Sequence, residues 1–309
     1  MSFAQLAEIA LTVAGLCTFE VVSSLDNAVV NAEVLGTMAP RARRWFLLWG
    51  ILIAVFAIRG ALPWLIVWAT NPALGMVGAF VATLSGDVAA ARSVQDSAPI
   101  VLAGGGVFLV FLFCHWIFLE TKEFGLRPER FLQRQGVWFY AVVSLLLTAI
   151  VWFAIHRNVY MAFAAVVGST VFFITHGFKQ NAERAEQHLI SGGIGMTDLS
   201  KLFYLEAIDA SFSIDGVLGA FAFTLSVPLI LAGNGLGAVV LRRLTVGNIE
   251  RIKRYRLVKN GAMYSIAILG SAMLLEAFGV HVPSWFAPVS TLAVIGYFLH
   301  RSIKAARSR

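Results

Sequence analysis

Residues 19–35 read FEVVSSLDNAVVNAEVL and residues 205–224 read LEAIDASFSIDGVLGAFAFT, two apolar stretches that each carry several acidic side chains. Acids are rare inside long apolar runs, because a charge at the centre of a bilayer costs roughly 2.5–3.5 kcal/mol on insertion scales. Such residues normally face other protein groups or a water-filled cavity. The two stretches therefore predict a polar interior region in a fold whose remaining sequence is apolar.

The whole chain is strongly apolar. Its 309 residues are 59% hydrophobic and only 13% charged, and the mean hydropathy is +0.79. One or two soluble cores need far fewer apolar side chains, so the composition predicts an integral membrane protein. The net charge of +7 comes from Lys and Arg in short loops between apolar runs, a pattern that does not indicate nucleic-acid binding. The two cysteines are far apart, which excludes a disulfide framework and a thiolate zinc site.

A membrane-spanning helix needs about 20 mostly apolar residues, and this length divides the chain into about nine expected spans. They cover residues 6–36, 45–69, 99–119, 137–155, 159–177, 200–223, 226–242, 260–278 and 285–300. The first run lacks a basic start and continues into polar residues, which favours a retained span over a cleaved signal peptide. The expected fold class is therefore an all-α, multi-pass integral membrane protein.

Basic residues follow every odd-numbered span and end the chain, whereas the intervening connections are poor in them. By the positive-inside rule, this asymmetry predicts an external N-terminus and a cytoplasmic C-terminus in the inner (plasma) membrane. One missed span would place basic loops on both sides of the membrane. The charge pattern is thus an internal check on the number of spans.

Polar residues in each acidic stretch repeat at helical spacing and fall on one face. These faces hold Glu20, Ser24, Asn27 and Asn31 in the first stretch, and Glu206, Asp209 and Ser213 in the second. Asp26 and Asp215 lie about 120° away from those faces at ~3.6 residues per turn. Either these two acids face another neighbour, or the helix is unwound where they occur, as in transporters with broken helices.

The two acidic stretches also resemble copies of each other. Aligning Asp26 with Asp215 places Glu20 on Asp209, an acid six residues earlier in both. Downstream, the spacing Gly50-x3-Ala54-x4-Arg59 recurs as Gly233-x3-Gly237-x4-Arg242, with small residues where helices are expected to approach closely.

The predicted directions of the first and sixth spans are opposite, so these copies form an inverted-topology repeat. We expect one membrane domain over residues 1–309, with a first repeat at about 6–119 and a second at about 200–300. Helices at about 137–177 and a cytoplasmic connection at 178–199 would join the two repeats. The interface between inverted repeats is where many secondary transporters hold their substrate.

The segments FEVVSSLDNAVVNAEVL, LLWGILIAVFAIR and LEAIDASFSIDGVLGAFAFT resemble the TerC (tellurium-resistance) family, in its TerC-like uncharacterised branch. The resemblance implies a relation to the lysine-exporter superfamily and the export of divalent metals, chiefly manganese. It implies metal ligands at Glu20, Asp26 and Asn27 in the first motif, and at Glu206, Asp209 and Asp215 in the second. It also implies a charge-balancing role for Arg59 and Arg242. One departure is Gly216, where the family usually has serine.

Carboxylate, amide and hydroxyl oxygens suit Mg²⁺, Ca²⁺ or Mn²⁺ better than Zn²⁺ or Cu⁺. No ATP-binding or hydrolase motif occurs, so we expect a secondary transporter of a divalent cation and not an enzyme. The resemblance implies that the transporter is an exporter. We expect no resident cofactor. The protein's expected partners are the metal ion and the lipid bilayer, with the oligomeric state left open.

The alternative is a non-transporting membrane scaffold or a metal or tellurite stress-resistance factor, whose acids form a structural network. Arg242 is equally well explained as an anchor at the cytoplasmic interface. His115 and His176 have no ligand-spaced partner in the sequence, so we expect them to be core or interface side chains.

Overall fold

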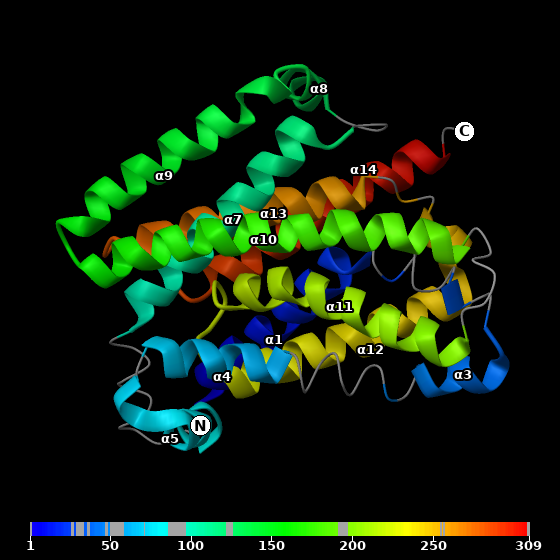
Figure 1. The fold of residues 1–309 in the computed structure, drawn as a ribbon, viewed down its shortest axis with the longest axis horizontal. Coiled ribbons are helices and arrows are strands. Elements are labelled where there is room, and N and C mark those ends of the chain that lie inside the picture. The colour runs from blue at the N-terminus through cyan, green and yellow to red at the C-terminus, as the bar shows by residue number, and fades with distance from the viewer. Residues whose placement is uncertain are drawn as a thin grey trace.

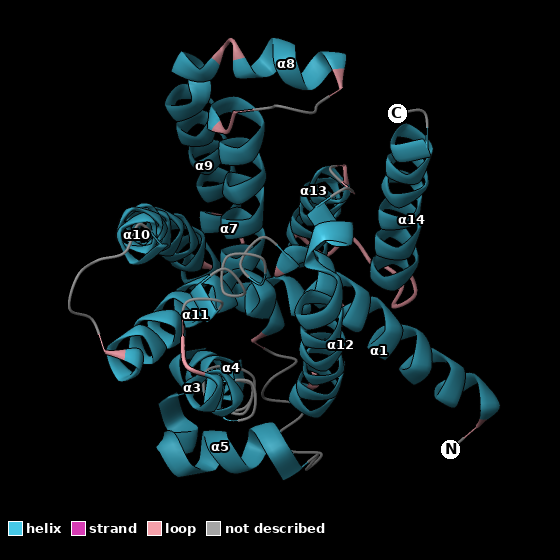
Figure 2. Cartoon of the chain, turned by 90° about the vertical axis from the view of Figure 1, so that its right-hand side faces the viewer, coloured by secondary structure: helices cyan, strands magenta, loops and turns pink. Residues whose placement is uncertain are grey.

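The computed structural model describes residues 2–25, 28, 34–35, 38–46, 49, 59–70, 72–85, 97–121, 126–190, 197–253, 255 and 257–307, with the backbone alone in parts of several helices. The regular structure of these residues is entirely helical, and they contain no strand. The long helices form a bundle (Figure 1), and an end-on view shows that they differ in tilt, with the start of α1 projecting toward the N-terminus at the edge (Figure 2). The all-α prediction is confirmed.

The helices have the following bounds, in chain order: α1 Phe3–Ser23, α3 Pro40–Trp45, α4 Arg59–Thr70, η3 Pro72–Leu74, α5 Gly75–Ser85, α7 Ala98–Leu119, α8 Arg127–Gln133, η4 Gly136–Trp138, α9 Phe139–Ile155, α10 Val159–Ile190, α11 Asp198–Ala220, α12 Val227–Lys253, α13 Val258–Ala277 and α14 Phe286–Arg307. Among the described residues, two glycines have a positive φ, Gly75 at 65° and Gly279 at 79°. Both stand next to a helix end, where only glycine adopts this conformation without strain.

Five helices are long and apolar enough to cross a membrane, and they overlap five of the expected spans, although the first, expected at 6–36, ends as helix α1 already at Ser23. The five helices are Phe3–Ser23, Ala98–Leu119, Gly136–Ile155, Val159–Phe178 and Val258–Ala277. These helices indicate a multi-pass membrane protein. The count of nine spans with an inverted repeat is not confirmed. The expected spans at 200–223, 226–242 and 285–300 lie in α11, α12 and α14, which are helical but do not reach the same apolar length, because charged residues interrupt or follow their apolar runs.

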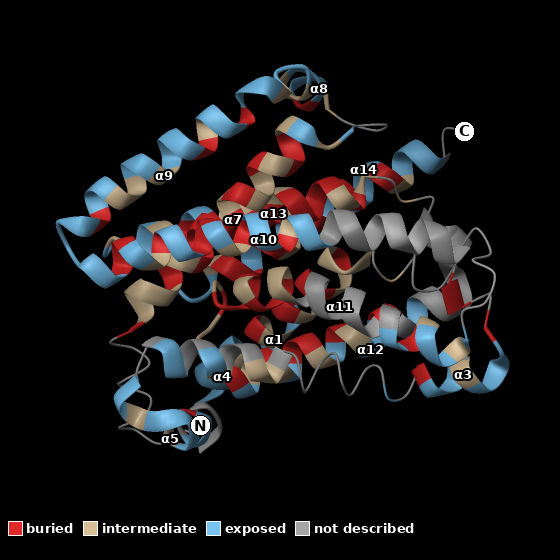
Figure 3. Ribbon diagram, in the orientation of Figure 1, coloured by how far each residue is buried: buried red, intermediate tan, exposed pale blue. Residues whose placement is uncertain are grey.

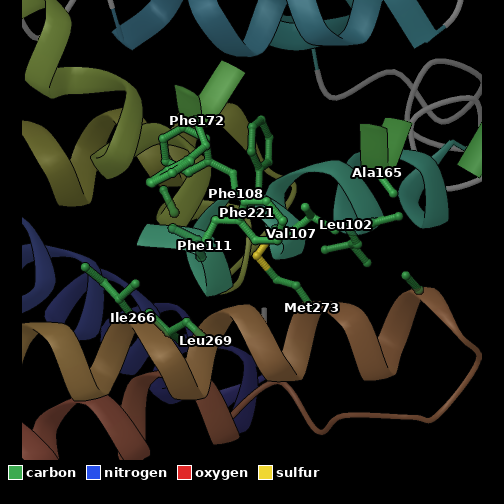
Figure 4. Close-up of a cluster of buried hydrophobic side chains, with 14 of the residues drawn as sticks. Leu102, Val107, Phe108, Phe111, Ala165, Phe172, Phe221, Ile266, Leu269 and Met273 are labelled. Atoms are coloured by element: carbon green, nitrogen blue, oxygen red, sulfur yellow. The ribbon is translucent and has the colours of Figure 1, made fainter. Parts of the chain in front are cut away.

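The central helix is α7, which packs against α13 on one side and α10 on another. Gly105 of α7 faces Met273, whereas Leu109, one turn further along, faces Gly270, so α7 and α13 run in opposite directions. Ring contacts from Phe108 and Phe111 to Phe172 place α10 on the other side of α7 (Figure 4). Apolar side chains of these helices make the main buried core.

Helix α9 is the most peripheral of the long apolar helices. Only 17% of its apolar window is buried, compared with 61% for α7 and for α13. Figure 3 shows the same contrast, with pale blue surface along α9 and red along α7 and α13. An apolar helix that is exposed over most of its surface suits hydrocarbon better than water, since the bilayer does not penalise exposed apolar side chains.

Three segments differ from the expected boundaries. Helix α10 continues to Ile190, so the first part of the predicted connection at 178–199 is helical. Helix α12 continues to Lys253, through most of the basic connection that follows the seventh span. The connection between the second and third spans contains η3 and α5, and the Trp64 indole N–H donates to the Met76 carbonyl at 2.9 Å. Apolar length marks only the part of a helix that suits a membrane, whereas polar sequences rich in Ala, Glu and Arg also form helix.

Candidate functional site

Helix α1 brings the acid of the first motif into the interior. Glu20 is 1% exposed and lies against α12, where a Cβ added at Gly237 would come 2.6 Å from Glu20 Cβ. One turn earlier, a Cβ added at Gly233 would come 2.5 Å from Leu16 Cβ. The two helices run in the same direction and approach so closely that only glycine fits at both positions. The expectation of close approach at this small-residue pair is confirmed.

The same carboxylate also faces α11, which carries the second acidic motif. A Cβ added at Gly216 would lie 3.2 Å from Glu20 Oε2, and one added at Gly219 would lie 2.5 Å from the ring of Phe19. Since the residue numbers run oppositely, α1 and α11 are antiparallel at this crossing. Asp215 precedes Gly216, and Oδ1 of Asp215, like Oε2 of Glu20, is buried. The crossing thus brings the Glu20 carboxylate beside the Asp215-Gly216 step, as expected for a shared polar region.

Helix α11 is continuous from Asp198 to Ala220, so it is not unwound at Asp215. Of the two possibilities left by the spacing, an unwound helix at Asp215 is therefore excluded. Helix α1 ends at Ser23. The next residue, Ser24, donates from its hydroxyl to Glu20 Oε1 at 2.9 Å. The expected polar face of the first stretch thus exists at its first two positions.

Helix α12 adds a polar side chain that sequence reasoning passed over. Asn234 is 0% exposed and lies between the two glycines that contact α1. Neither atom of its side-chain amide has a hydrogen-bond partner within the described part of the chain. Burying an amide in this way costs on the order of 1–3 kcal/mol. In the sequence, Asn234 could have been recognised as a candidate because it is an amide side chain inside the apolar run at 227–241.

The remaining predicted site residues are placed only in part. Asp26 and Asn27 lie outside the described residues. Glu206 and Asp209 belong to α11, Arg59 opens α4 and Arg242 belongs to α12, but the described structure gives the backbone alone at these four positions. Their ligand and charge-balancing roles stay predictions. Among the described residues, no three His, Cys, Asp or Glu side chains gather as a metal site would require.

A second polar cluster lies between α8 and α13. Glu129 is 0% exposed, and its Oε2 accepts from the Leu126 backbone N–H and from the Asn260 amide, both at 2.8 Å. Next to it, the Lys259 ammonium forms an ion pair with Glu120. Hydrogen bonds to a charged acceptor are stronger than neutral ones, so the Glu129 carboxylate ties the α8 segment to α13.

The two histidines from α7 and α10 meet in the core. The ring centroids of His115 and His176 are 3.8 Å apart, and Phe139 and Phe172 pack against them at 5.6 and 5.9 Å. The expectation of interface histidines is confirmed. Their contact with each other was not predicted, because it joins residues from different helices.

The fold and its buried acids define a helical, multi-pass membrane protein with carboxylates at an interior helix crossing. The family described as "Protein of unknown function (DUF475)" matches residues 25–309, and the chain belongs to this family. No curated protein and no solved structure matches the chain.

The resemblance to the TerC family is wrong, because the family match is to DUF475 and no match to the TerC family was found. That resemblance was carried by three short apolar segments and was strongest at the two acidic motifs. Carboxylates, amides and small residues are the types that any buried polar site between membrane helices favours, so they do not distinguish families.

Proposed function

We propose that this protein binds a divalent cation that prefers oxygen ligands and moves it across the plasma membrane. The observation that carries the proposal is the burial of the Glu20 carboxylate against α11, beside the Asp215-Gly216 step. Ionisable groups inside membrane helices are costly, and they commonly mark ion pathways. The export direction and manganese in particular came from the overturned resemblance and are not retained.

The donor set supports a hard cation. Glu20 and Asp215 supply carboxylate oxygens and Ser24 supplies a hydroxyl that already bonds Glu20. Mg²⁺, Ca²⁺ and Mn²⁺ prefer such oxygens. Protons compete with a metal for the same carboxylates, so a proton gradient can drive the exchange.

Helix directions support alternating access around this crossing. Helix α1 runs parallel to α12 and antiparallel to α11, and it makes close glycine contacts with both. In transporters built from inverted repeats, units of this kind move against each other around a fixed site. The basic connections favour a cytoplasmic C-terminus and an external N-terminus.

A scaffold without transport is the second candidate. The hydrogen bond from Ser24 to Glu20 and the close α1–α12 contact are also what a structural polar network would contain. In that case the acids fix helix packing and no ion crosses the membrane.

Ion flux into sealed vesicles that contain only this purified protein separates the two candidates. Mg²⁺, Ca²⁺ and Mn²⁺ are tested one at a time with an indicator dye trapped inside. Asp215→Asn and Glu20→Gln keep the side-chain shape and remove the charge, so each should abolish flux while helical content is unchanged. Glu8→Gln makes the same chemical change at an exposed position of α1 and should leave flux unchanged.

Two outcomes would decide against transport at this site. Flux at the wild-type rate in Asp215→Asn would remove the acid from the ion pathway. No flux of any of the three ions through folded wild-type protein would favour the scaffold.

A further inference from the structure

A large apolar cavity lies on the side of α11 away from α1. Its volume is about 920 Å³, and α4, η3, α7, α10 and α11 all contribute to its wall, through residues that include Ala69, Pro72, Val101, Ala164 and Ile214. This volume is at the upper end of the 300–1,000 Å³ range of pockets that hold small molecules. The cavity is therefore large enough for a bound ligand.

The chemistry of the wall restricts what the cavity can hold. Its lining residues are Ala, Gly, Ile, Leu, Phe, Pro and Val, together with one tyrosine, Tyr160. Water needs two to four polar partners to occupy a site, so water does not fill this space well. A wholly empty space of this size would forfeit the contacts that make protein interiors dense. The apolar wall therefore suits a hydrocarbon chain as the bound ligand.

The cavity is continuous with the surface that faces the bilayer. Val159 and Phe163 belong to its wall, yet they are 65% and 67% exposed. Both lie on α10, beside the peripheral apolar helix α9. A lipid chain can thus enter from the hydrocarbon layer without crossing a polar barrier.

A cation at the end of α9 is close in sequence to the cavity wall. Arg157 is exposed and lies two residues before Val159. Its Nη1 donates to the Phe278 carbonyl, and its guanidinium lies 5.8 Å from the centre of the Phe278 ring. A guanidinium has five N–H donors, so these contacts orient the group and leave donors for an anion such as phosphate.

We propose that this cavity binds an acyl chain of an anionic bilayer phospholipid, with the phosphate at Arg157. Ile214 and Leu218 of the wall flank Asp215 along α11. The bound chain thus packs against the same helix that carries the buried acid, on its other side. Binding of the lipid does not depend on ion transport and is tested separately from it.

The test uses the full-length protein in phosphatidylcholine vesicles that contain phosphatidylglycerol with a photoreactive diazirine in one acyl chain. After illumination, labelled peptides are identified by mass spectrometry. We expect adducts at wall positions such as Val101 and Ile214. Val101→Phe puts a larger side chain into the cavity and should lower the adduct at Ile214. Leu145→Phe, at a 71% exposed position of α9, should leave it at the wild-type level.

Adducts confined to the outer surface of α9 would overturn the proposal, because they would indicate only the surrounding bilayer. Equal labelling of Ile214 in Val101→Phe and wild type would also overturn it. If Val101→Phe does not elute as a folded protein, Ile214→Phe enlarges a second wall residue, with a lower adduct at Val101 as the expected readout.

Two further arms test the headgroup. Arg157→Gln should abolish the preference for phosphatidylglycerol over a phosphatidylcholine probe with the same chain, whereas Arg134→Gln, at an exposed position before α9, should preserve it. Diazirine-labelled palmitic acid replaces the phospholipid in a parallel sample. Labelling of the wall by this fatty acid and not by phosphatidylglycerol would overturn the assignment to a phospholipid.

Discussion

Replacing Gly237 by alanine tests the close contact that positions the buried acid. The added Cβ would lie 2.6 Å from Glu20 Cβ, 2.7 Å from Glu20 Cγ and 2.9 Å from the Cys17 carbonyl oxygen. Ordinary contacts between carbon atoms are about 3.5–4.0 Å, so α12 has to move away from α1 by roughly 1 Å. The Cys17 oxygen is a backbone atom, so a side-chain rotation cannot relieve the contact.

The magnitude follows from two opposing effects. Overpacking a close contact costs roughly 1–3 kcal/mol, whereas alanine stabilises a helix by about 1 kcal/mol relative to glycine. Gly296→Ala is the matched control, because a Cβ at this exposed position of α14 meets no atom within 4 Å. Comparing the free energies of unfolding of the two variants cancels the effect of helix propensity. Gly237→Ala should be less stable than Gly296→Ala by ~1–3 kcal/mol, or roughly 5- to 150-fold in the unfolding equilibrium.

The assay is reversible unfolding of both variants in mixed micelles, followed by circular dichroism, with ion flux measured in vesicles. Gly237→Ala should unfold more readily than Gly296→Ala and should lose flux, since the displaced helix no longer holds the Glu20 carboxylate against α11. If the two variants differ by less than about 0.5 kcal/mol, which is within the scatter of independent surface substitutions, the inferred helix contact is absent.

Two further predictions address the second polar cluster and the orientation in the membrane. Asn260→Ala removes a donor from the buried Glu129 carboxylate and should lower the free energy of unfolding by ~1.5–3 kcal/mol in the same unfolding assay. Glu120→Gln alters a half-exposed ion pair and should lower it by only ~0–1 kcal/mol. Equal losses of stability in the two variants would contradict the argument. Single cysteines at Arg44 and Arg92, in a chain without its two native cysteines, should react with an impermeant reagent from opposite sides of the membrane, and labelling of both from one side would refute the predicted topology.

The segments that the sequence predicted well are those whose behaviour depends on local composition. The expected span at 99–119 corresponds to α7 at Ala98–Leu119, and the one at 260–278 to α13 at Val258–Ala277. About 20 apolar residues in a row suffice to specify a helix that suits a bilayer, whatever it packs against. The Gly233 and Gly237 pair was recognisable for a similar reason, since small residues four apart mark one helix face.

Helix boundaries outside the apolar runs were predicted less well. Helix α5 was taken as part of a connection, and α10 extends well past residue 177 to Ile190. Polar or short helices leave no apolar window of membrane length, so hydropathy does not detect them. The family assignment failed for a related reason, because three short segments carried it while the DUF475 match extends over residues 25–309.

The sequence by itself determined that this chain is helical, apolar enough for a membrane and equipped with acids inside its apolar runs. These properties follow from composition and from spacing along one helix, which are local. Only the tertiary structure decided that Glu20 lies beside Gly216, that His115 meets His176, that Asn234 is buried and that an apolar cavity borders α11. Each of these joins residues from different helices, and the helix crossings that bring them together depend on how whole surfaces pack.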